Sequence, residues 1–174
     1  MHLASLSPQN VAQPSQSADK SRSYVVFRVD RQHYALPLDH VIRAVRMVAF
    51  TPVPDVSRSV LGIINMAGQM LPVIDLRFLF GQACKDPELQ DVLLVVQMQG
   101  QTVAITVDEV LNVQEFTSRQ VQSPPGAVPE SRFVAGAIQQ EDILIFLLND
   151  FSLFPNIDAR MADRLPDDEK ISSR

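Results

Sequence analysis

The sequence has no tryptophan, only 6% aromatic residues and no excess of positive charge. Its formal net charge is −5, from 15 lysine and arginine residues against 20 aspartate and glutamate residues. A nucleic-acid-binding domain needs a basic surface to displace counterions, and a single-strand binder also needs aromatic side chains for base stacking. We therefore do not expect nucleic acid as a partner.

Cysteine is represented by one residue, Cys84, so no disulfide can form within the chain. A single thiol is compatible with a reducing compartment, and a nucleophilic role would need an imidazole base that the sequence does not identify. The longest apolar run, at residues 143–148, is far shorter than the roughly 20 residues that span a bilayer. Residues 1–22 have no apolar signal core and are rich in serine, glutamine, proline and alanine, which predicts a flexible arm. We expect a cytoplasmic protein without direct membrane insertion.

Glycine and histidine are also scarce, with six and three residues. The glycines form no phosphate-binding loop, and Gly68 is interpreted as supplying a positive φ to the turn at residues 66–69 of a hairpin. The histidines, at positions 2, 33 and 40, do not have metal-ligand spacing with cysteine or carboxylate residues. The sequence therefore predicts no metal and no cofactor.

An internal repeat is the main feature that the sequence does contain. Residues 35–41 align with residues 104–110, and residues 60–64 align with residues 134–138. The second alignment continues without gaps to a Leu-Phe pair near the end of each copy. The shared order, spacing and strand-end residue types favour duplication over chance agreement between apolar strands.

Each copy contains several short strands separated by turns, which indicates small closed β-barrels rather than a parallel sheet. One copy buries too little surface to be stable alone, so the two should pack together and leave an apolar crease between them. We predict an all-β fold of two pseudo-symmetric barrels, at about residues 23–82 and 90–155, with strand exchange between them as an open alternative. Gly62 and Gly136 should open equivalent strands.

Carboxylates at strand ends are the strongest candidates for acid–base chemistry. They are Asp39, Asp75, Asp108 and Asp150. Each also lies where its side chain can cap a short helical turn, and an active site is seldom duplicated in both halves of a protein. The capping interpretation is therefore favoured, and the protein is not expected to be an enzyme. The enzyme alternative is a small hydrolase or lyase that uses Asp39 and Asp75, whose carboxyl groups would have to converge in a cleft.

Four segments of the sequence carry a family resemblance. They are the pattern FxVxxxxYALPLxxV at 27–41, TPVP at 51–54, GIINMAGQMLPVIDLR at 62–77 and VAITVDEV at 103–110. In this order they are similar to the CheW-like domain family. The resemblance delimits a domain at residues 23–155 and leaves residues 156–174 as a C-terminal tail.

The resemblance implies two SH3-like, five-stranded barrels with a few short helices, and a non-catalytic adaptor. Members of this family couple chemoreceptors, the methyl-accepting proteins, to a CheA-type histidine kinase in bacterial chemosensory systems. The implied partners are the regulatory domain of that kinase and the cytoplasmic hairpin tip of the receptor, which would bind in the crease between the barrels. The implied location is cytoplasmic, at membrane-associated receptor arrays.

Carried over to this sequence, the resemblance implies five receptor or kinase interaction residues: Val41, Arg43, Met66, Ala67 and Met70. Two of them depart from the family, which usually has arginine at the position of Ala67 and commonly an acidic residue at that of Arg43. Loss of a desolvated arginine–carboxylate pair weakens binding by about 2–5 kcal/mol, against about 0–1 kcal/mol for an exposed charge. The alternative function is therefore a CheW-like regulatory module of a non-chemotaxis pathway, such as surface motility or second-messenger signalling, with altered or no receptor contact.

Overall fold

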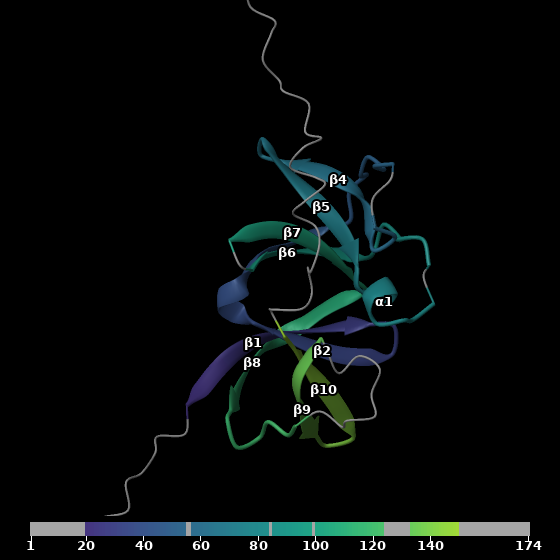
Figure 1. Ribbon diagram of the computed structural model, residues 1–174. Coiled ribbons are helices and arrows are strands. Elements are labelled where there is room, and N and C mark those ends of the chain that lie inside the picture. The colour runs from purple at the N-terminus through teal and green to yellow at the C-terminus, as the bar shows by residue number, and fades with distance from the viewer. Residues whose placement is uncertain (1–19, 55–56, 84, 99, 124–132, 150–174) are drawn as a thin grey trace, which may run out of the picture.

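The computed structural model describes residues 20–54, 57–83, 85–98, 100–123 and 133–149. The described residues form two five-stranded sheets, and each sheet curls into a small barrel. The two barrels lie one above the other in the view of Figure 1, and they are named the lower and the upper barrel from that view. The predicted all-β fold with two barrels is confirmed.

The lower barrel contains β1 (Ser21–Val29), β2 (Gln32–Pro37), β8 (Glu109–Thr117), β9 (Val134–Gln140) and β10 (Ile143–Leu148). They form one sheet in the order β8-β1-β2-β10-β9. Neighbouring strands are antiparallel except β2 and β10, which are parallel. Valine, isoleucine and aromatic residues are frequent in these segments, and such residues favour a pleated, half-buried surface.

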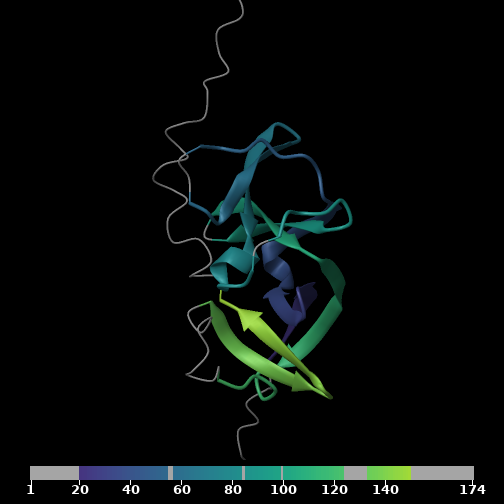
Figure 2. The same ribbon diagram turned by 90° about the vertical axis from the view of Figure 1, so that its right-hand side faces the viewer.

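The upper barrel contains β3 (Val41–Arg46), β4 (Val60–Met66), β5 (Gln69–Asp75), β6 (Val92–Met98) and β7 (Gln101–Val107). Their order is β3-β6-β7-β5-β4, and β5 and β7 form the parallel pair. Two short helices, η1 (Leu38–His40) and α1 (Leu76–Leu79), lie near the seam between the barrels. Figure 2 shows the β4–β5 and β9–β10 hairpins at opposite ends of the molecule.

Each barrel is built from both halves of the sequence. After β1 and β2 the chain crosses through η1 and supplies β3, β4 and β5 to the upper barrel, and after β7 it crosses back to complete the lower barrel with β8, β9 and β10. The predicted division into consecutive barrels at 23–82 and 90–155 is therefore wrong, and strand exchange describes the fold. The alternation of apolar residues indicates where each strand lies in the sequence. It does not indicate which of the two barrels the strand joins.

Both barrels use equivalent parts of the repeat. The parallel pair of β5 and β7 places Val73 opposite Ala104, and the parallel pair of β10 and β2 places Leu147 opposite Ala35. Val73 matches Leu147 and Ala104 matches Ala35 in the repeat alignment, so the two barrels share a register. Chance similarity between apolar strands does not fix a shared register, so this agreement supports duplication.

The buried apolar side chains form three clusters. One cluster fills each barrel, and their members occupy matching repeat positions, as Ile64 and Ile138 or Val95 and Val26 do. The third cluster lies between the barrels and takes side chains from both of them and from α1. The seam is therefore packed core along this cluster rather than an open apolar crease. Its buried members are Val25, Phe27, Val29, Tyr34, Leu36, Ile74, Leu76, Phe80, Leu94, Val96, Val103, Ile105, Val107, Phe133, Val134 and Leu148.

The hairpin predicted around residues 66–69 is present, with Met66 opposite Gln69 in the antiparallel pair of β4 and β5. The turn residues Ala67 and Gly68 both have positive φ, at 53° and 85°, as a two-residue turn between twisted strands requires. The Asn65 side chain accepts a hydrogen bond of 3.0 Å from the amide of Gly68. Glycine adopts this conformation freely, whereas it costs Ala67 about 1–2 kcal/mol.

The first strand begins at Ser21, inside the predicted arm of residues 1–22, because Ser21 and Arg22 already pair with the end of β8. Residues 1–19, the predicted tail at 156–174, and also Cys84 and Asp150, lie outside the described residues. Within the described part of the chain, no helix has both the length and the apolar content to cross a membrane.

Gly62 and Gly136 lie at matching points where another backbone segment crosses closely. The Thr51 backbone crosses beside Gly62, and the Gln122 backbone crosses beside Gly136. A Cβ atom on Gly62 would lie 2.8 Å from the Phe50 ring and 2.9 Å from the carbonyl carbon of Thr51, and one on Gly136 would lie 3.1 Å from the carbonyl oxygen of Gln122. Glycine at these two positions therefore allows a second backbone segment to pass close to the strand.

The substitution Gly62→Ala should lower the free energy of unfolding by about 1–3 kcal/mol, because the Thr51 backbone must move to admit a methyl group. Urea denaturation measures the change. The control is Gly100→Asn: Gly100 has φ of 80° and open space at its Cβ position, and asparagine tolerates that conformation. Equal losses in the two variants would contradict the close-approach explanation.

Candidate functional site

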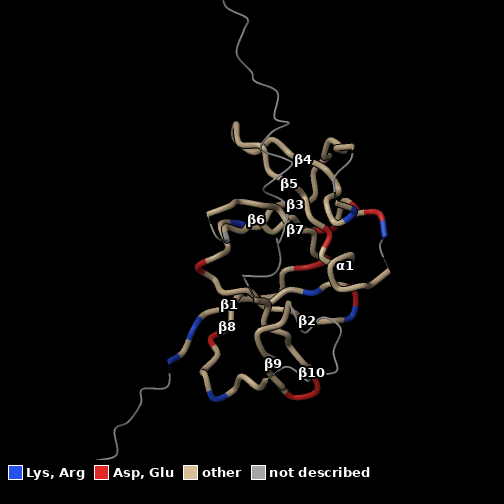
Figure 3. Tube along the Cα trace, in the orientation of Figure 1, with Lys and Arg blue, Asp and Glu red and all other residues tan. Residues whose placement is uncertain are grey.

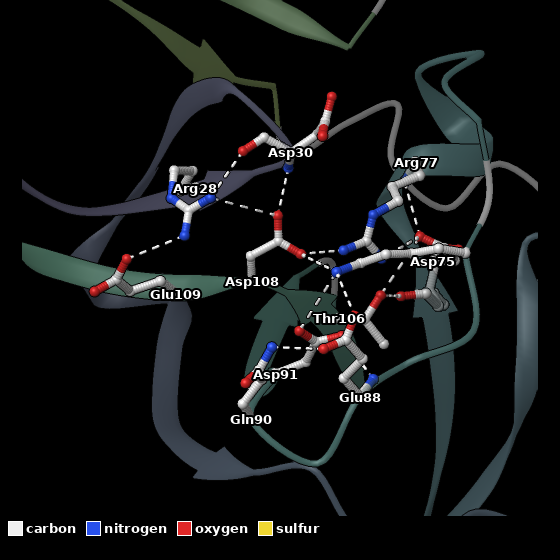
Figure 4. A network of polar contacts seen from close by, with 12 residues as sticks. Arg28, Asp30, Asp75, Arg77, Glu88, Gln90, Asp91, Thr106, Asp108 and Glu109 are labelled. Atoms are coloured by element: carbon white, nitrogen blue, oxygen red, sulfur yellow. Dashed lines mark hydrogen bonds and ion pairs between the residues drawn. The ribbon is translucent and has the colours of Figure 1, made fainter.

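A buried arginine, Arg77, lies in a network of polar contacts at the seam between the barrels (Figure 4). Its side chain is only 2% exposed. Asp75 caps α1, because its Oδ1 atom accepts a hydrogen bond of 2.9 Å from the amide of Arg77, as the capping interpretation predicts. The cap fixes the first turn of α1 and therefore the direction in which the Arg77 side chain leaves the backbone.

The guanidinium of Arg77 lies between two carboxylates. Its Nη2 atom donates to Asp108 Oδ1, and its Nη1 atom lies 3.7 Å from Asp75 Oδ1. The hydroxyl of Thr106 lies 3.5 Å from the same Asp75 oxygen, and Lys85 Nζ lies 3.5 Å from Asp108 Oδ1. A charge this deeply buried needs opposite charges and hydrogen bonds, and Asp108 and Asp75 supply them in part. Among the described residues, the Nη1 atom of Arg77 has an ion-pair contact but no hydrogen-bond partner.

Asp108 links the upper barrel to the lower one. It stands where the chain crosses from β7 to β8, and its Oδ2 atom accepts a hydrogen bond from the amide of Asp30, in the turn between β1 and β2. The amide of Asp108 donates to the carbonyl oxygen of Arg28 at 2.9 Å. The Arg28 side chain extends the network, because its Nη2 atom lies 3.2 Å from Glu109 Oε2. The network therefore joins α1 and β7 to the β1–β2 turn.

Asp39, the repeat partner of Asp108, has a different environment. The N-cap residue of η1 is Pro37, which makes no side-chain cap. Both carboxylate oxygens of Asp39 instead lie 2.9 Å from Arg22 Nη2, and the side chain is 66% exposed. The caps predicted for Asp39 and Asp108 are therefore wrong, because arginine side chains and the Asp30 amide take their oxygens. Asp39 and Asp75 also do not converge in a cleft, as the enzyme alternative requires.

These environments move two pKa values in opposite directions. Burial raises the pKa of Asp75, and the amide and charge of Arg77, with the Thr106 hydroxyl, oppose the shift only in part. Slight burial acts to raise the pKa of Asp39, but the hydrogen bond and charge of Arg22 outweigh it, so that this pKa lies below its ordinary value. The folded protein therefore disfavours ionisation of Asp75 and favours ionisation of Asp39.

A polar recess of about 430 Å³ opens beside the network, where charged residues gather next to α1 (Figure 3). Acidic and basic side chains line it and pair with one another. Within the described ranges, no cluster of histidine, cysteine and carboxylate side chains has the arrangement of a metal site. The recess is lined by Arg28, Asp30, Lys85, Gln90, Asp91, Asp108 and Glu109.

The five predicted interaction residues lie in two separate places on the upper barrel. Val41 and Arg43 are on β3, with Val41 half-buried against the core between the barrels and Arg43 exposed. Met66, Ala67 and Met70 are on the β4–β5 hairpin, where Met66 is half-buried, Ala67 is exposed and Met70 is 44% exposed. In the sheet β6 and β7 separate β3 from β5. The predicted residues therefore lie on two elements, β3 and the β4–β5 hairpin.

Exposed apolar residues on β3 and β8 are not among the predicted site residues. Ile42 is 52% exposed and Leu111 is 38% exposed, and the two residues match in the repeat. Each is the residue that a β-bulge leaves without a partner in its strand pairing. A bulge breaks the alternation of inward and outward side chains, so only the matched repeat position could have indicated these residues from sequence.

The model of the CheW-like domain family matches residues 23–157. With the two-barrel fold and a match over most of its length, this chain belongs to the CheW-like domain family, which is a family of scaffold proteins. The predicted resemblance is confirmed.

Known proteins of the same kind cover most of the chain. The chemotaxis protein CheW of Rhizobium meliloti is 28% identical over 137 residues, which are 78% of this chain and 88% of that protein. Protein PilI of Pseudomonas aeruginosa is 28% identical over 72% of both chains, and protein FrzA of Myxococcus xanthus is 29% identical over 70% of this chain and 77% of its own. The crystal structure of the scaffolding protein TtCheW from Thermoanaerobacter tengcongensis aligns with a TM-score of 0.69 and 27% identity, over 75% of this chain and 90% of that one.

The substitution Arg77→Met should lower the free energy of unfolding by about 3–5 kcal/mol, because it leaves the carboxylates of Asp75 and Asp108 without their buried cation. Urea denaturation measures the loss. The matched control is Arg22→Met, which breaks the exposed pair with Asp39 and should cost about 0–1 kcal/mol. Similar losses in both variants would show that burial does not distinguish the two arginines.

The substitution Asp75→Asn tests the raised pKa of Asp75. An asparagine side chain can still accept a hydrogen bond from the Arg77 amide, but it cannot ionise. The folded pKa of Asp75 lies above the unfolded value of 3.8. As pH rises, Asp75 therefore loses its proton at a lower pH in the unfolded chain than in the folded protein. The contribution of Asp75 to the free energy of unfolding falls as pH rises from below 3.8 through the folded pKa. Urea titrations over that pH window should show the variant gaining free energy of unfolding relative to the wild type. A relative loss with rising pH would contradict the direction of the shift.

Proposed function

We propose that this protein is a non-catalytic adaptor of a bacterial chemosensory system, which couples chemoreceptors to a CheA-type histidine kinase by holding them in position. The observation that carries the proposal is the family match over residues 23–157, on a two-barrel fold that aligns with a scaffolding protein. Several relatives are named chemotaxis proteins. The partners are the regulatory domain of the kinase and the cytoplasmic hairpin tip of a receptor, and the receptor holds the adaptor at membrane-associated arrays.

The β4–β5 hairpin is the proposed receptor contact. It projects at the far end of the upper barrel and carries Met70, which is 44% exposed, beside the exposed turn residue Ala67. An amphipathic helix binds through exposed apolar side chains, and the unbranched methionine side chain adapts to such a surface. Val41 and Arg43 on β3 mark the second contact, in which half-buried Val41 supports the strand and Arg43 meets the partner.

A second candidate is a regulatory module that binds the kinase with altered or no receptor contact, in surface motility or second-messenger signalling. It is favoured by exposed Arg43, which places a positive charge where the family commonly has a negative one. Ala67 also favours the regulatory module, because an alanine side chain in the turn cannot form an ion pair with a receptor. The relatives PilI and FrzA, which do not carry the name CheW, are compatible with this candidate.

Titration calorimetry with a cognate kinase regulatory domain and with a receptor cytoplasmic fragment tests the proposal. Both should bind, and Met70→Asp should weaken receptor binding by about tenfold or more, because it desolvates a charge in an apolar contact. The control is Leu89→Asp in the loop before β6, where Leu89 is 85% exposed and outside the proposed contact.

The outcomes separate the candidates. Folded protein that binds neither partner rejects both functions. Kinase binding without receptor binding supports the regulatory module, especially if Ala67→Arg introduces receptor affinity. If Ala67→Arg leaves measurable receptor affinity unchanged, the turn lies outside the contact.

A further inference from the structure

The lower barrel has a recess at its mouth, between the start of β1 and the end of β8. Tyr24 and Phe116 line the recess, and both side chains contribute to the apolar cluster that fills this barrel. Their ring centroids lie 5.6 Å apart, with 43° between the ring planes. The volume of the recess is about 530 Å³. Small molecules bind in pockets of roughly 300–1,000 Å³, and barrel mouths are common places for them.

The upper barrel has different side chains at the matching positions. In the lower barrel Arg22 pairs with Phe116 between β1 and β8. The same positions of the repeat are Asp91 and Met47 in the upper barrel, where the amide of Met47 donates to the carbonyl oxygen of Asp91 at 2.9 Å. Asp91 is only 2% exposed, whereas the side chain of Arg22 is 49% exposed. The backbone pairing is therefore the same, but only the lower mouth presents a cation.

The two mouths also differ in how they are filled. The bridge residues Thr51 and Gln122 pair with matched positions of β4 and β9, so the preceding residues, Phe50 and Val121, occupy equivalent places. The Phe50 ring packs against the cluster inside the upper barrel. Val121 lines the recess of the lower barrel. Because valine has no ring, it leaves space at the lower mouth that phenylalanine fills at the upper one.

Cationic side chains border the recess, and basic residues mark the start of β1 (Figure 3). The guanidinium carbon of Arg22 lies 6.0 Å from the centroid of the Tyr24 ring. Asp39 is bound to the Nη2 atom of Arg22, and the other nitrogen atoms of that guanidinium have no partner among the described residues. Lys20 also lines the recess, and none of the described residues that line it is acidic. The recess therefore combines an aromatic surface with positive charge.

We propose that the mouth of the lower barrel binds a small aromatic carboxylate. The ring of the ligand packs against Tyr24 and Phe116, and its carboxylate accepts hydrogen bonds from Arg22 and Lys20. Because Arg22 lies beside the Tyr24 ring, the carboxylate of the ligand has to be close to its own ring. This site goes beyond the adaptor function, because the proposed receptor and kinase contacts lie on the upper barrel.

Amide NMR titrations of the full chain with phenylacetate and benzoate test the site. Both should bind saturably and shift amide signals at the start of β1 and the end of β8. The affinity should fall with salt, because the cationic groups are exposed. Phenylacetamide has the ring without the charge, and acetate has the charge without the ring. Each should bind about tenfold more weakly than phenylacetate or worse, because each loses one part of the recognition.

Two variants separate the contributions of charge and space. Arg22→Met removes the charge and keeps a long side chain, so it should weaken phenylacetate binding by about tenfold. Val121→Phe places the upper-barrel residue at the lower mouth and should abolish binding, while the amide spectrum shows whether this variant is folded. The matched control is Arg31→Met, in the exposed turn between β1 and β2, which should bind as the wild type does.

The absence of saturable binding by both phenylacetate and benzoate overturns the proposal. Equal affinities for phenylacetate and phenylacetamide overturn it as well, and so does an Arg22→Met variant that binds as tightly as the wild type. A folded Val121→Phe variant that still binds would show that the ligand lies elsewhere. Because neither receptor nor kinase is present in these titrations, each of these failures leaves the adaptor function untouched.

Discussion

One buried ion pair, between Arg77 in α1 and Asp108 at the crossover from β7 to β8, lies at the seam where the two barrels meet. A guanidinium removed from water is destabilising by several kcal/mol unless anions and hydrogen bonds replace its hydration. Asp75 and Asp108 supply part of that replacement, and the Nη1 atom of Arg77 has no hydrogen-bond partner among the described residues. Asp108 also binds the Asp30 amide of the lower barrel. Arg77 therefore has both carboxylates beside it when α1 is capped and the barrels are docked.

Around this pair, the repeat provides one backbone frame with two sets of side chains. The parallel strand pairs, the close approaches at Gly62 and Gly136 and the barrel interiors are equivalent in both copies. The carboxylates of Asp39 and Asp108 are not equivalent, because one is exposed beside Arg22 and the other is enclosed in the network. An adaptor needs different surfaces on a rigid frame, and this divergence supplies them without a change of fold.

Sequence reasoning succeeded where a feature is local and failed where it depends on distant partners. The hairpin at residues 66–69 and the cap by Asp75 follow from neighbouring residues alone. Arg77 was not singled out, because arginine is usually exposed and its burial depends on Asp108, 31 residues further along the chain. The barrel that each strand joins and the exposure of Ile42 likewise depend on pairing between strands. The alternation of apolar residues along the sequence does not specify that pairing.

The exchange of strands has a consequence for the origin and dissection of this fold. A polypeptide with one repeat would hold two strands of one barrel and three of the other, so it could complete neither barrel by itself. Two such polypeptides could rebuild all ten strands as an interlocked homodimer, of which the present chain is the covalently fused form. If the chain is cut in the loop before β6, the two fragments should therefore fold only when both are present.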